Sequence, residues 1–209
     1  MTRFASRFDA SRRQHLRALL GCTALLATPA LWAQSAGATI GGVSFGGRAD
    51  VGGQQLQLNG VGLRASAVLK GFAAGLYLAQ PSHSTEQVLH TPGPKRLRMR
   101  MLLDVPIQVF THAVRKGIRR NVPEAQQAAL SERIGTFDGI LQAVGKVFDG
   151  DVIDLDYLPN SGLVIVINGK PRGAPIPGED LYAALMLVFI GERPVDAKLK
   201  AGLLGQRSA

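Results

Sequence analysis

Alternation of polar and apolar side chains is clearest between Lys95 and Leu103. One face of this segment carries arginines and the other carries apolar side chains, namely Arg96, Arg98 and Arg100 against Leu97, Met99 and Met101. A repeat of two residues is typical of a strand that lies on a core with one face only. The pattern therefore predicts a half-buried strand with a cationic outer face.

Repeats of 2 and of 3.6 residues divide the rest of the chain into strands, helices, strands and helices, in that order. Strands are expected as a loose edge hairpin over 39–53, as two or three strands over 56–79, and at 151–157, 163–167 and 172–176. Helices are expected from Ser84 to the turn at 92–94, from Pro106 onward, as one broken or two consecutive helices over 124–148, and over 178–190 and 196–204. This order favours an α+β fold, with an antiparallel sheet that carries helices on one face.

The helix that begins at Pro106 is amphipathic. Its apolar side holds Ile107, Phe110, Val114, Gly117 and Ile118, whereas Arg115, Lys116, Arg119 and Arg120 lie largely away from that side. No aromatic side chains alternate with these cations, although proteins that bind single-stranded nucleic acid stack its bases on aromatic rings. We therefore expect solvated basic faces and no nucleic-acid partner.

The first 33 residues have the composition of an export signal. A basic segment with five arginines precedes an apolar stretch from Ala18 to Trp32, and small residues suited to cleavage follow. Ala33 and Ala38 are the candidate last residues of this leader. The segment 11–17 resembles the twin-arginine consensus, so the twin-arginine and the ordinary secretory route both stay open. We expect a mature protein that is soluble in the periplasm, because no later apolar run is long and uncharged enough for stable membrane insertion.

Removal of that leader changes the composition. Five arginines and one aspartate leave with it, which lowers the formal charge from +9 to +5, and the one cysteine, Cys22, leaves as well. The mature chain then has no thiol for catalysis, for a disulfide or for a thiolate metal ligand. About 175 residues remain, which is enough for a single domain with its own core, expected over 39–205.

Gly60 to Ala65 matches the dinucleotide fingerprint G-x-G-x-x-G/A. The fingerprint requires a strand before the glycines and a helix directly after them, within a βαβ unit. Here Gly71 and Gly75 follow, and the intervening residues have no helical stripe of polar side chains. We therefore expect no nicotinamide or flavin cofactor.

Clustered aspartates suggest a calcium site, but the spacing does not fit one. Asp149, Asp151, Asp154 and Asp156 lack the glutamate and the central glycine of a calcium loop. Asp154 and Asp156 share a strand face, which we expect to be solvated. The histidines after the leader form no pair at ligand spacing, so no metal is expected.

The segment from Gln54 to Gln80 contains only two charges, Arg64 and Lys70. A guanidinium keeps its proton, so its burial without an anion or acceptors is strongly unfavourable. Arg64 therefore either extends to water or receives a partner from the fold. With a partner, it is either a structural arginine bonded to protein groups, or an anion-holding residue at the inner end of an apolar pocket. Suitable walls for such a pocket are Phe72, Leu76, Phe110, Val114, Leu185, Val188 and Phe189.

Six short motifs, in order, resemble those of one protein family. They are Leu58-Asn59-Gly60-Val61-Gly62-Leu63-Arg64, Gly75-Leu76-Tyr77-Leu78, Pro94-Lys95-Arg96-Leu97, Asp156-Tyr157-Leu158-Pro159, Asn168-Gly169-Lys170-Pro171 and Leu187-Val188-Phe189-Ile190-Gly191. Together they span nearly all of 40–205, and the chain resembles the chalcone isomerase superfamily, specifically its exported bacterial chalcone isomerase-like branch. The resemblance implies an open-faced β-sandwich, in which a large antiparallel sheet faces a layer of helices and a ligand cleft lies between them.

The resemblance also implies positions for the ligand site. The arginine, threonine, tyrosine, asparagine and final hydroxyl residue of the plant isomerases fall here on or near Arg64, Phe72, Phe110, Gly117 and Val188. Only the arginine is retained, and loss of one donor to a developing oxyanion typically lowers the rate about 10²–10³-fold. An apolar cavity that ends in an arginine suits a hydrophobic carboxylate such as a fatty acid, which the non-catalytic members of the superfamily bind.

We therefore expect a non-catalytic domain that binds a small hydrophobic anion through Arg64, Phe72, Phe110, Val114, Gly117, Val188 and Phe189. Two alternatives stay open. An isomerase or intramolecular lyase acting on an enone-like, chalcone-type substrate would need another acid, for which Tyr77 and Tyr182 are the available phenols. An interaction module would dock an acidic partner on its basic faces and would have no ligand in the cavity.

Overall fold

The computed structural model describes residues 36–65 and 70–206, so the export signal predicted over 1–33 lies outside the described residues. Within these ranges the elements are β1 (Ala38–Ile40), β2 (Val43–Phe45), β3 (Arg48–Val51), β4 (Gln54–Ala65), β5 (Lys70–Leu78), α1 (Thr85–His90), β6 (Lys95–Met101), β7 (Val105–Pro106), α2 (Ile107–Asn121), α3 (Glu124–Gln142), β8 (Lys146–Val147), β9 (Val152–Leu158), β10 (Gly162–Ile167), β11 (Lys170–Ile176), α4 (Glu179–Ile190) and α5 (Ala197–Leu203).

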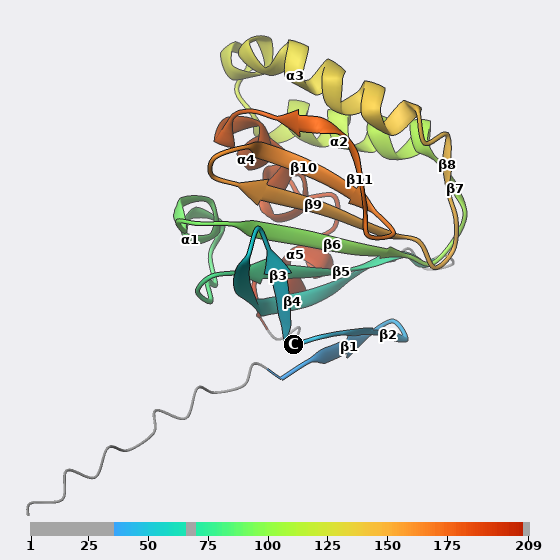
Figure 1. The fold of residues 1–209 in the computed structure, drawn as a ribbon, viewed down its shortest axis with the longest axis vertical. Helices are drawn as coiled ribbons and strands as arrows, with labels where there is room; N and C mark the ends of the chain where they lie inside the picture. The colour runs from blue at the N-terminus through green and yellow to red at the C-terminus, as the bar shows by residue number, and fades with distance from the viewer. Residues whose placement is uncertain (1–35, 66–69, 207–209) are drawn as a thin grey trace, which may run out of the picture. The chain divides into compact units, whose positions relative to one another are not determined.

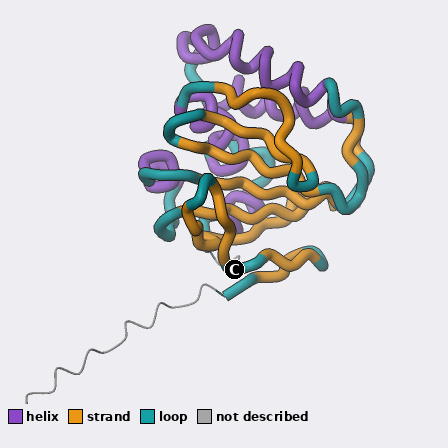
Figure 2. Tube along the Cα trace, viewed as in Figure 1, coloured by secondary structure: helices purple, strands orange, loops and turns teal. Residues whose placement is uncertain are grey.

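One antiparallel sheet of seven strands organises the domain, in the order β11-β10-β9-β6-β5-β4-β3 (Figure 1). Helix α4 packs on β10, α5 packs along β4, and α2 and α3 pack on α4. Figure 2 shows the strands of this sheet as one layer, with the long helices beside it. This arrangement confirms the predicted α+β fold, in which a large antiparallel sheet carries helices on one face.

The strand predicted from the alternation at 95–103 is β6, and its apolar side chains lie as expected. Leu97, Met99 and Met101 are buried in the main core between the sheet and the helices. The opposite face of the sheet carries a smaller apolar cluster of Val51, Leu56 and Tyr77. Both faces are therefore apolar in part, and the larger core lies on the helix face.

The expectation of solvated charges on β6 and β9 holds for Arg100, which is exposed, and is wrong for the two other arginines and the aspartates. Arg96 lies opposite Asp156 and Arg98 opposite Asp154 across the two strands. Each guanidinium donates two hydrogen bonds to its carboxylate, of 2.6 Å from Arg96 and 2.7 Å from Arg98. The aspartate side chains are only 3% and 7% exposed. The expectation failed because it considered each strand alone, whereas the register between them places opposite charges side by side.

The 56–79 segment forms two strands, as predicted, and two other segments differ from the prediction in detail. Bulges between Leu58 and Gly60 and between Arg64 and Ala65 interrupt the regular register of β4. The 124–148 segment begins with one continuous helix, α3, and ends in the short strand β8. The 39–53 segment divides into the hairpin β1–β2 and the edge strand β3.

Candidate functional site

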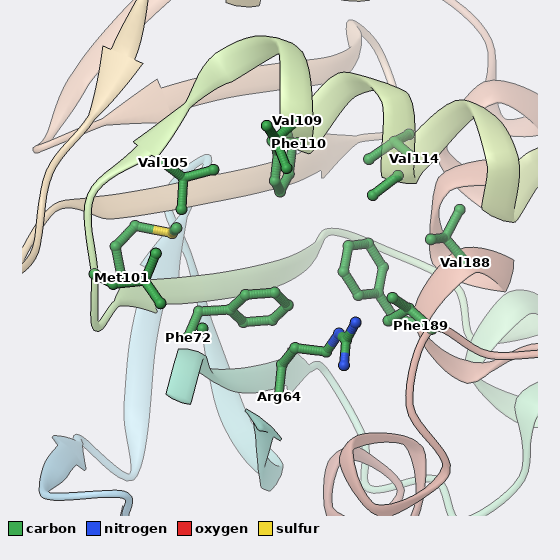
Figure 3. A pocket seen from close by; sticks show the side chains of 13 residues that line it. Arg64, Phe72, Met101, Val105, Val109, Phe110, Val114, Val188 and Phe189 are labelled. Carbon is green, nitrogen blue, oxygen red and sulfur yellow. The ribbon is translucent and has the colours of Figure 1, made fainter. Parts of the chain in front are cut away.

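Three side chains form a row across the sheet. Arg64 of β4 lies opposite Phe72 of β5, and Phe72 lies opposite Met101 of β6. Residues directly opposite each other in an antiparallel pair project to the same face. Phe72 and Met101 belong to the main core, so the row lies on the helix face, toward α2 and α4 (Figure 3).

A pocket of about 380 Å³ lies between this row and the two helices. Small-molecule sites usually have volumes of roughly 300–1,000 Å³. The rings of Phe72 and Phe189 meet edge to face at its wall, with centroids 6.5 Å apart. The lining residues are Arg64, Gly71, Phe72, Met101, Leu103, Val105, Val109, Phe110, Ala113, Val114, Val188, Phe189 and Val195.

Most of the predicted contact residues come together here. Arg64, Phe72, Phe110, Val114, Val188 and Phe189 all line the pocket, and Figure 3 shows the Arg64 side chain extending toward Phe189. Gly117 does not line it. A Cβ atom at Gly117 would lie 2.5 Å from Cγ1 of Val188, so this glycine allows α2 to approach α4 next to the pocket wall. The predicted walls Leu76 and Leu185 are buried in the core instead.

Several lining residues were not predicted. Met101 shares the face of Leu97 and Met99, so the alternation of β6 contained the signal that places it with the apolar walls. Val109 gave no such signal, because it lies outside the apolar stripe of α2 and is 59% exposed. Val195 reaches the pocket because its backbone N–H bonds to the Val188 carbonyl at 2.8 Å, which folds the loop after α4 back on the helix.

Arg64 has a carboxylate beside it. Nη1 of Arg64 lies 3.6 Å from Oδ2 of Asp196, and the two side chains are 38% and 15% exposed. The other oxygen of Asp196 caps helix α5, since Oδ1 accepts hydrogen bonds from the backbone of Lys198 and Leu199 at 2.8 and 2.9 Å. At 3.6 Å, the contact between Arg64 and Asp196 is longer than a hydrogen bond. A guanidinium has five N–H donors. Arg64 therefore retains donors for a further anion in the pocket.

The glycines of the G-x-G motif explain why Asp196 lies there. A Cβ atom at Gly60 would lie 2.2 Å from the carbonyl oxygen of Gly202, and one at Gly62 would lie 2.5 Å from that of Leu199. Backbone atoms cannot yield as a flexible side chain can, so only glycine permits α5 to pack directly on β4. The motif serves helix packing, and this packing holds the N-terminal end of α5 against Arg64.

The pocket offers little for acid–base catalysis. Among the lining residues that the structure describes, none carries a hydroxyl, carboxyl or imidazole group. Tyr77 lies in the cluster on the opposite face of the sheet, where its hydroxyl donates to the Gly46 carbonyl at 3.1 Å. Tyr182 is buried in the core, and this burial raises the pKa of its phenol well above the usual value. Neither phenol available to an isomerase lines the pocket.

The described ranges, 36–65 and 70–206, contain no cluster of three His, Cys, Asp or Glu side chains that could hold a metal ion. In the same part of the chain, no helix is both long enough and apolar enough to cross a membrane.

Comparison with known proteins agrees with this architecture. A family model of chalcone isomerase-like proteins matches residues 37–205. A fatty-acid binding protein of Arabidopsis thaliana has the same fold, with a TM-score of 0.63 over 80% of this chain and 95% of its own, at 18% sequence identity. No match was found among curated protein sequences. Since the family model covers most of its length, the chain belongs to the chalcone isomerase-like family.

Proposed function

We propose that the protein binds a hydrophobic carboxylate such as a fatty acid, with the alkyl chain in the pocket and the carboxylate on Arg64. The observation that carries the proposal is the pocket itself, which has a volume of about 380 Å³ and a single charged residue among its described lining residues. The name of the Arabidopsis protein with the same fold, a fatty-acid binding protein, supports this class of ligand.

The physical chemistry of the site favours an amphiphile with an anionic end. Each methylene group that moves from water into an apolar pocket contributes about 0.8 kcal/mol. A hydrogen bond to a charged group contributes about 1.5–3 kcal/mol and fixes the orientation of the ligand. Phe72 and Phe189 provide the apolar contacts beside Arg64. A neutral hydrocarbon would gain only the burial of its methylene groups, so Arg64 favours a fatty acid over a hydrocarbon.

Titration of the purified protein with dodecanoate and hexadecanoate, followed by native mass spectrometry, tests the proposal. Arg64→Met should lower the affinity about 10–100-fold, which corresponds to the loss of one charge-assisted hydrogen bond. Arg48→Met is the matched control, since Arg48 is exposed on the edge strand β3, outside the pocket. Ala113→Trp places a large ring at a lining residue and should also weaken binding.

Two results would overturn the proposal. One is a wild-type protein that binds neither acid. The other is a protein whose affinity is the same in the wild type and in both pocket variants. Turnover of a panel of chalcones that is abolished by Arg64→Met would support the isomerase alternative instead.

The proposal includes export to the periplasm, supported by the basic and apolar composition of the first 33 residues. Bacterial cells that make the full chain should release it with the periplasmic fraction, whereas a version without residues 2–33 should stay in the cytoplasm. Retention of the full chain in the cytoplasm would contradict this part of the proposal.

A further inference from the structure

The pocket opens beside the exposed side of α2. Val109 lines the pocket and is 59% exposed, so an apolar side chain stands at the mouth in contact with solvent. Ala113, one turn further along α2, also lines the pocket and is exposed. Figure 3 shows Val109 at the α2 side of the cavity, above Phe110 in that view.

Cations continue the same stripe of α2. Val109, Ala113, Lys116 and Arg120 are spaced by four, three and four residues, which places them on one side of a helix. Arg119 lies next to them and is exposed, as are Lys116 and Arg120. At a rise of about 1.5 Å per residue, Arg120 lies only about 10 Å along the helix from Ala113. The mouth of the pocket and the cations can therefore meet one surface together.

These cations are not neutralised by nearby acids. The helix itself contains no aspartate or glutamate. Arg115 pairs with Asp138 of α3, but in the described part of the chain no carboxylate forms an ion pair with Lys116, Arg119 or Arg120. The cavity that Arg120 borders contains Arg193 and Lys200 together with Glu86 and Glu192, so its cations outnumber its carboxylates.

We propose that this side of α2, defined by Val109, Ala113, Lys116, Arg119 and Arg120, docks on an anionic lipid bilayer, from which the pocket takes up its ligand or to which it delivers it. The inference rests on the proposed function, because a bilayer is where an amphiphile with a long alkyl chain partitions. The occupant follows from charge complementarity: clustered lysines and arginines are attracted to anionic lipid head groups, and an exposed apolar side chain inserts at the boundary with the acyl chains. An acidic protein would match the charges but would not account for the apolar mouth beside them.

Sedimentation with vesicles of equal parts phosphatidylcholine and phosphatidylglycerol tests the proposal, and pure phosphatidylcholine vesicles are the neutral control. Neutralising the three cations, in the variant Lys116→Gln, Arg119→Gln and Arg120→Gln, should weaken partition onto the anionic vesicles about 100-fold. The matched control is Arg48→Gln, Lys170→Gln and Arg172→Gln, which removes equal charge from the exposed edge strands β3 and β11 and should partition almost as well as the wild type. Wild-type partition should also fall steeply at about 1 M salt, where the screening length is about 3 Å.

Measurement of dodecanoate affinity in solution, without vesicles, separates this inference from the proposed function. The α2 variant should keep the wild-type affinity, since none of its three substitutions lines the pocket. It should nevertheless transfer a fluorescent fatty acid to anionic vesicles at least about tenfold more slowly, because it spends less time on their surface. A protein that binds dodecanoate but ignores anionic vesicles, or whose two triple variants lose partition equally, would overturn the docking proposal alone. A wild-type protein that does not bind dodecanoate would count against the proposed function.

Discussion

Arginines on the two faces of the same sheet have different surroundings. On the face away from the helices, Arg96 and Arg98 each donate two hydrogen bonds to a buried aspartate, at 2.6 and 2.7 Å. On the helix face, Arg64 lies 3.6 Å from Asp196, an aspartate that also caps a helix, and it borders a pocket. The first arrangement is closed by protein groups, whereas the second leaves donors and space for a ligand.

The comparison shows how to tell a structural arginine from a binding one. Two hydrogen bonds hold the Arg98 guanidinium on Asp154, and they are the main cause that raises its pKa. Substitutions in the closed pairs should therefore change the stability of the fold, and substitutions around Arg64 should change ligand affinity. Four substitutions test this division and the helix packing that places Asp196 beside Arg64.

The largest effect is expected for Asp156→Ala. This change leaves the Arg96 side chain, which is 12% exposed, without its bidentate partner, and the remaining contact is Asp154 at 3.6 Å. Breaking one partner of a buried ion pair typically lowers the free energy of unfolding by about 3–5 kcal/mol. Urea denaturation followed by circular dichroism measures it, with the exposed Asp149→Ala as a control expected within about 0.5 kcal/mol of the wild type. A loss below 1 kcal/mol, roughly the value of a surface pair, would contradict the closed arrangement.

Gly62→Ala should have the next largest effect. The added methyl group would lie 2.5 Å from the carbonyl oxygen and 2.9 Å from the Cα atom of Leu199, so α5 has to move away from β4. Overpacking of this kind lowers the free energy of unfolding by about 1–3 kcal/mol. In Gly139→Ala the methyl group meets nothing within 4 Å, and this change in α3 should stabilise the protein by up to about 1 kcal/mol. Equal stability of the two variants would argue against direct packing of α5 on β4.

Asp196→Asn tests whether the carboxylate beside Arg64 limits the affinity of the pocket for an anion. Asparagine caps helices about as well as aspartate, so α5 should keep its N-cap. The negative charge that repels an incoming carboxylate disappears, and dodecanoate affinity should rise about fivefold, as expected for a partly exposed charge pair. Isothermal titration calorimetry measures the change. A lower affinity would instead show that Asp196 is needed to orient Arg64.

The smallest effect on stability is expected for Arg64→Met, the variant that should lose most of its affinity for fatty acids. Its ion pair is long and the side chain is 38% exposed, and such pairs contribute at most about 1 kcal/mol. Denaturant midpoints of the wild type and the variant should therefore nearly coincide. A large drop in the denaturant midpoint would show that Arg64 is a structural arginine like Arg96. The two faces of the sheet would then not differ in the role of their arginines.

Local patterns in the sequence predicted the elements well, because a repeat of two or 3.6 residues depends only on neighbours along the chain. The alternation that defines β6 and the apolar stripe of α2 are examples. Pairing between elements was harder to predict. The ladder of Arg96 and Arg98 with Asp156 and Asp154 depends on the register of two strands that are far apart in the sequence.

The pocket was predictable in part, since the family resemblance pointed to Arg64 and to aromatic and aliphatic walls. It could not place Asp196 beside Arg64, because that contact depends on α5 lying along β4. The resemblance also could not exclude Gly117 from the pocket lining. The space beside Gly117 is filled by Val188 of the neighbouring helix α4, which a sequence comparison does not show. Packing between distant elements, rather than propensity, decided these positions.

The direct contact between α5 and the glycines of β4 has a consequence for the order in which the protein is completed. Every strand of the sheet and both helices that wall the pocket are synthesised before α5. Until α5 packs on β4, the backbone at Gly60 and Gly62 stays uncovered and Asp196 is not held beside Arg64. A chain that ends before residue 196 should therefore be less soluble than the full chain, because Leu199 and Leu203 no longer cover their part of the core, and the Arg64 end of its pocket stays incomplete.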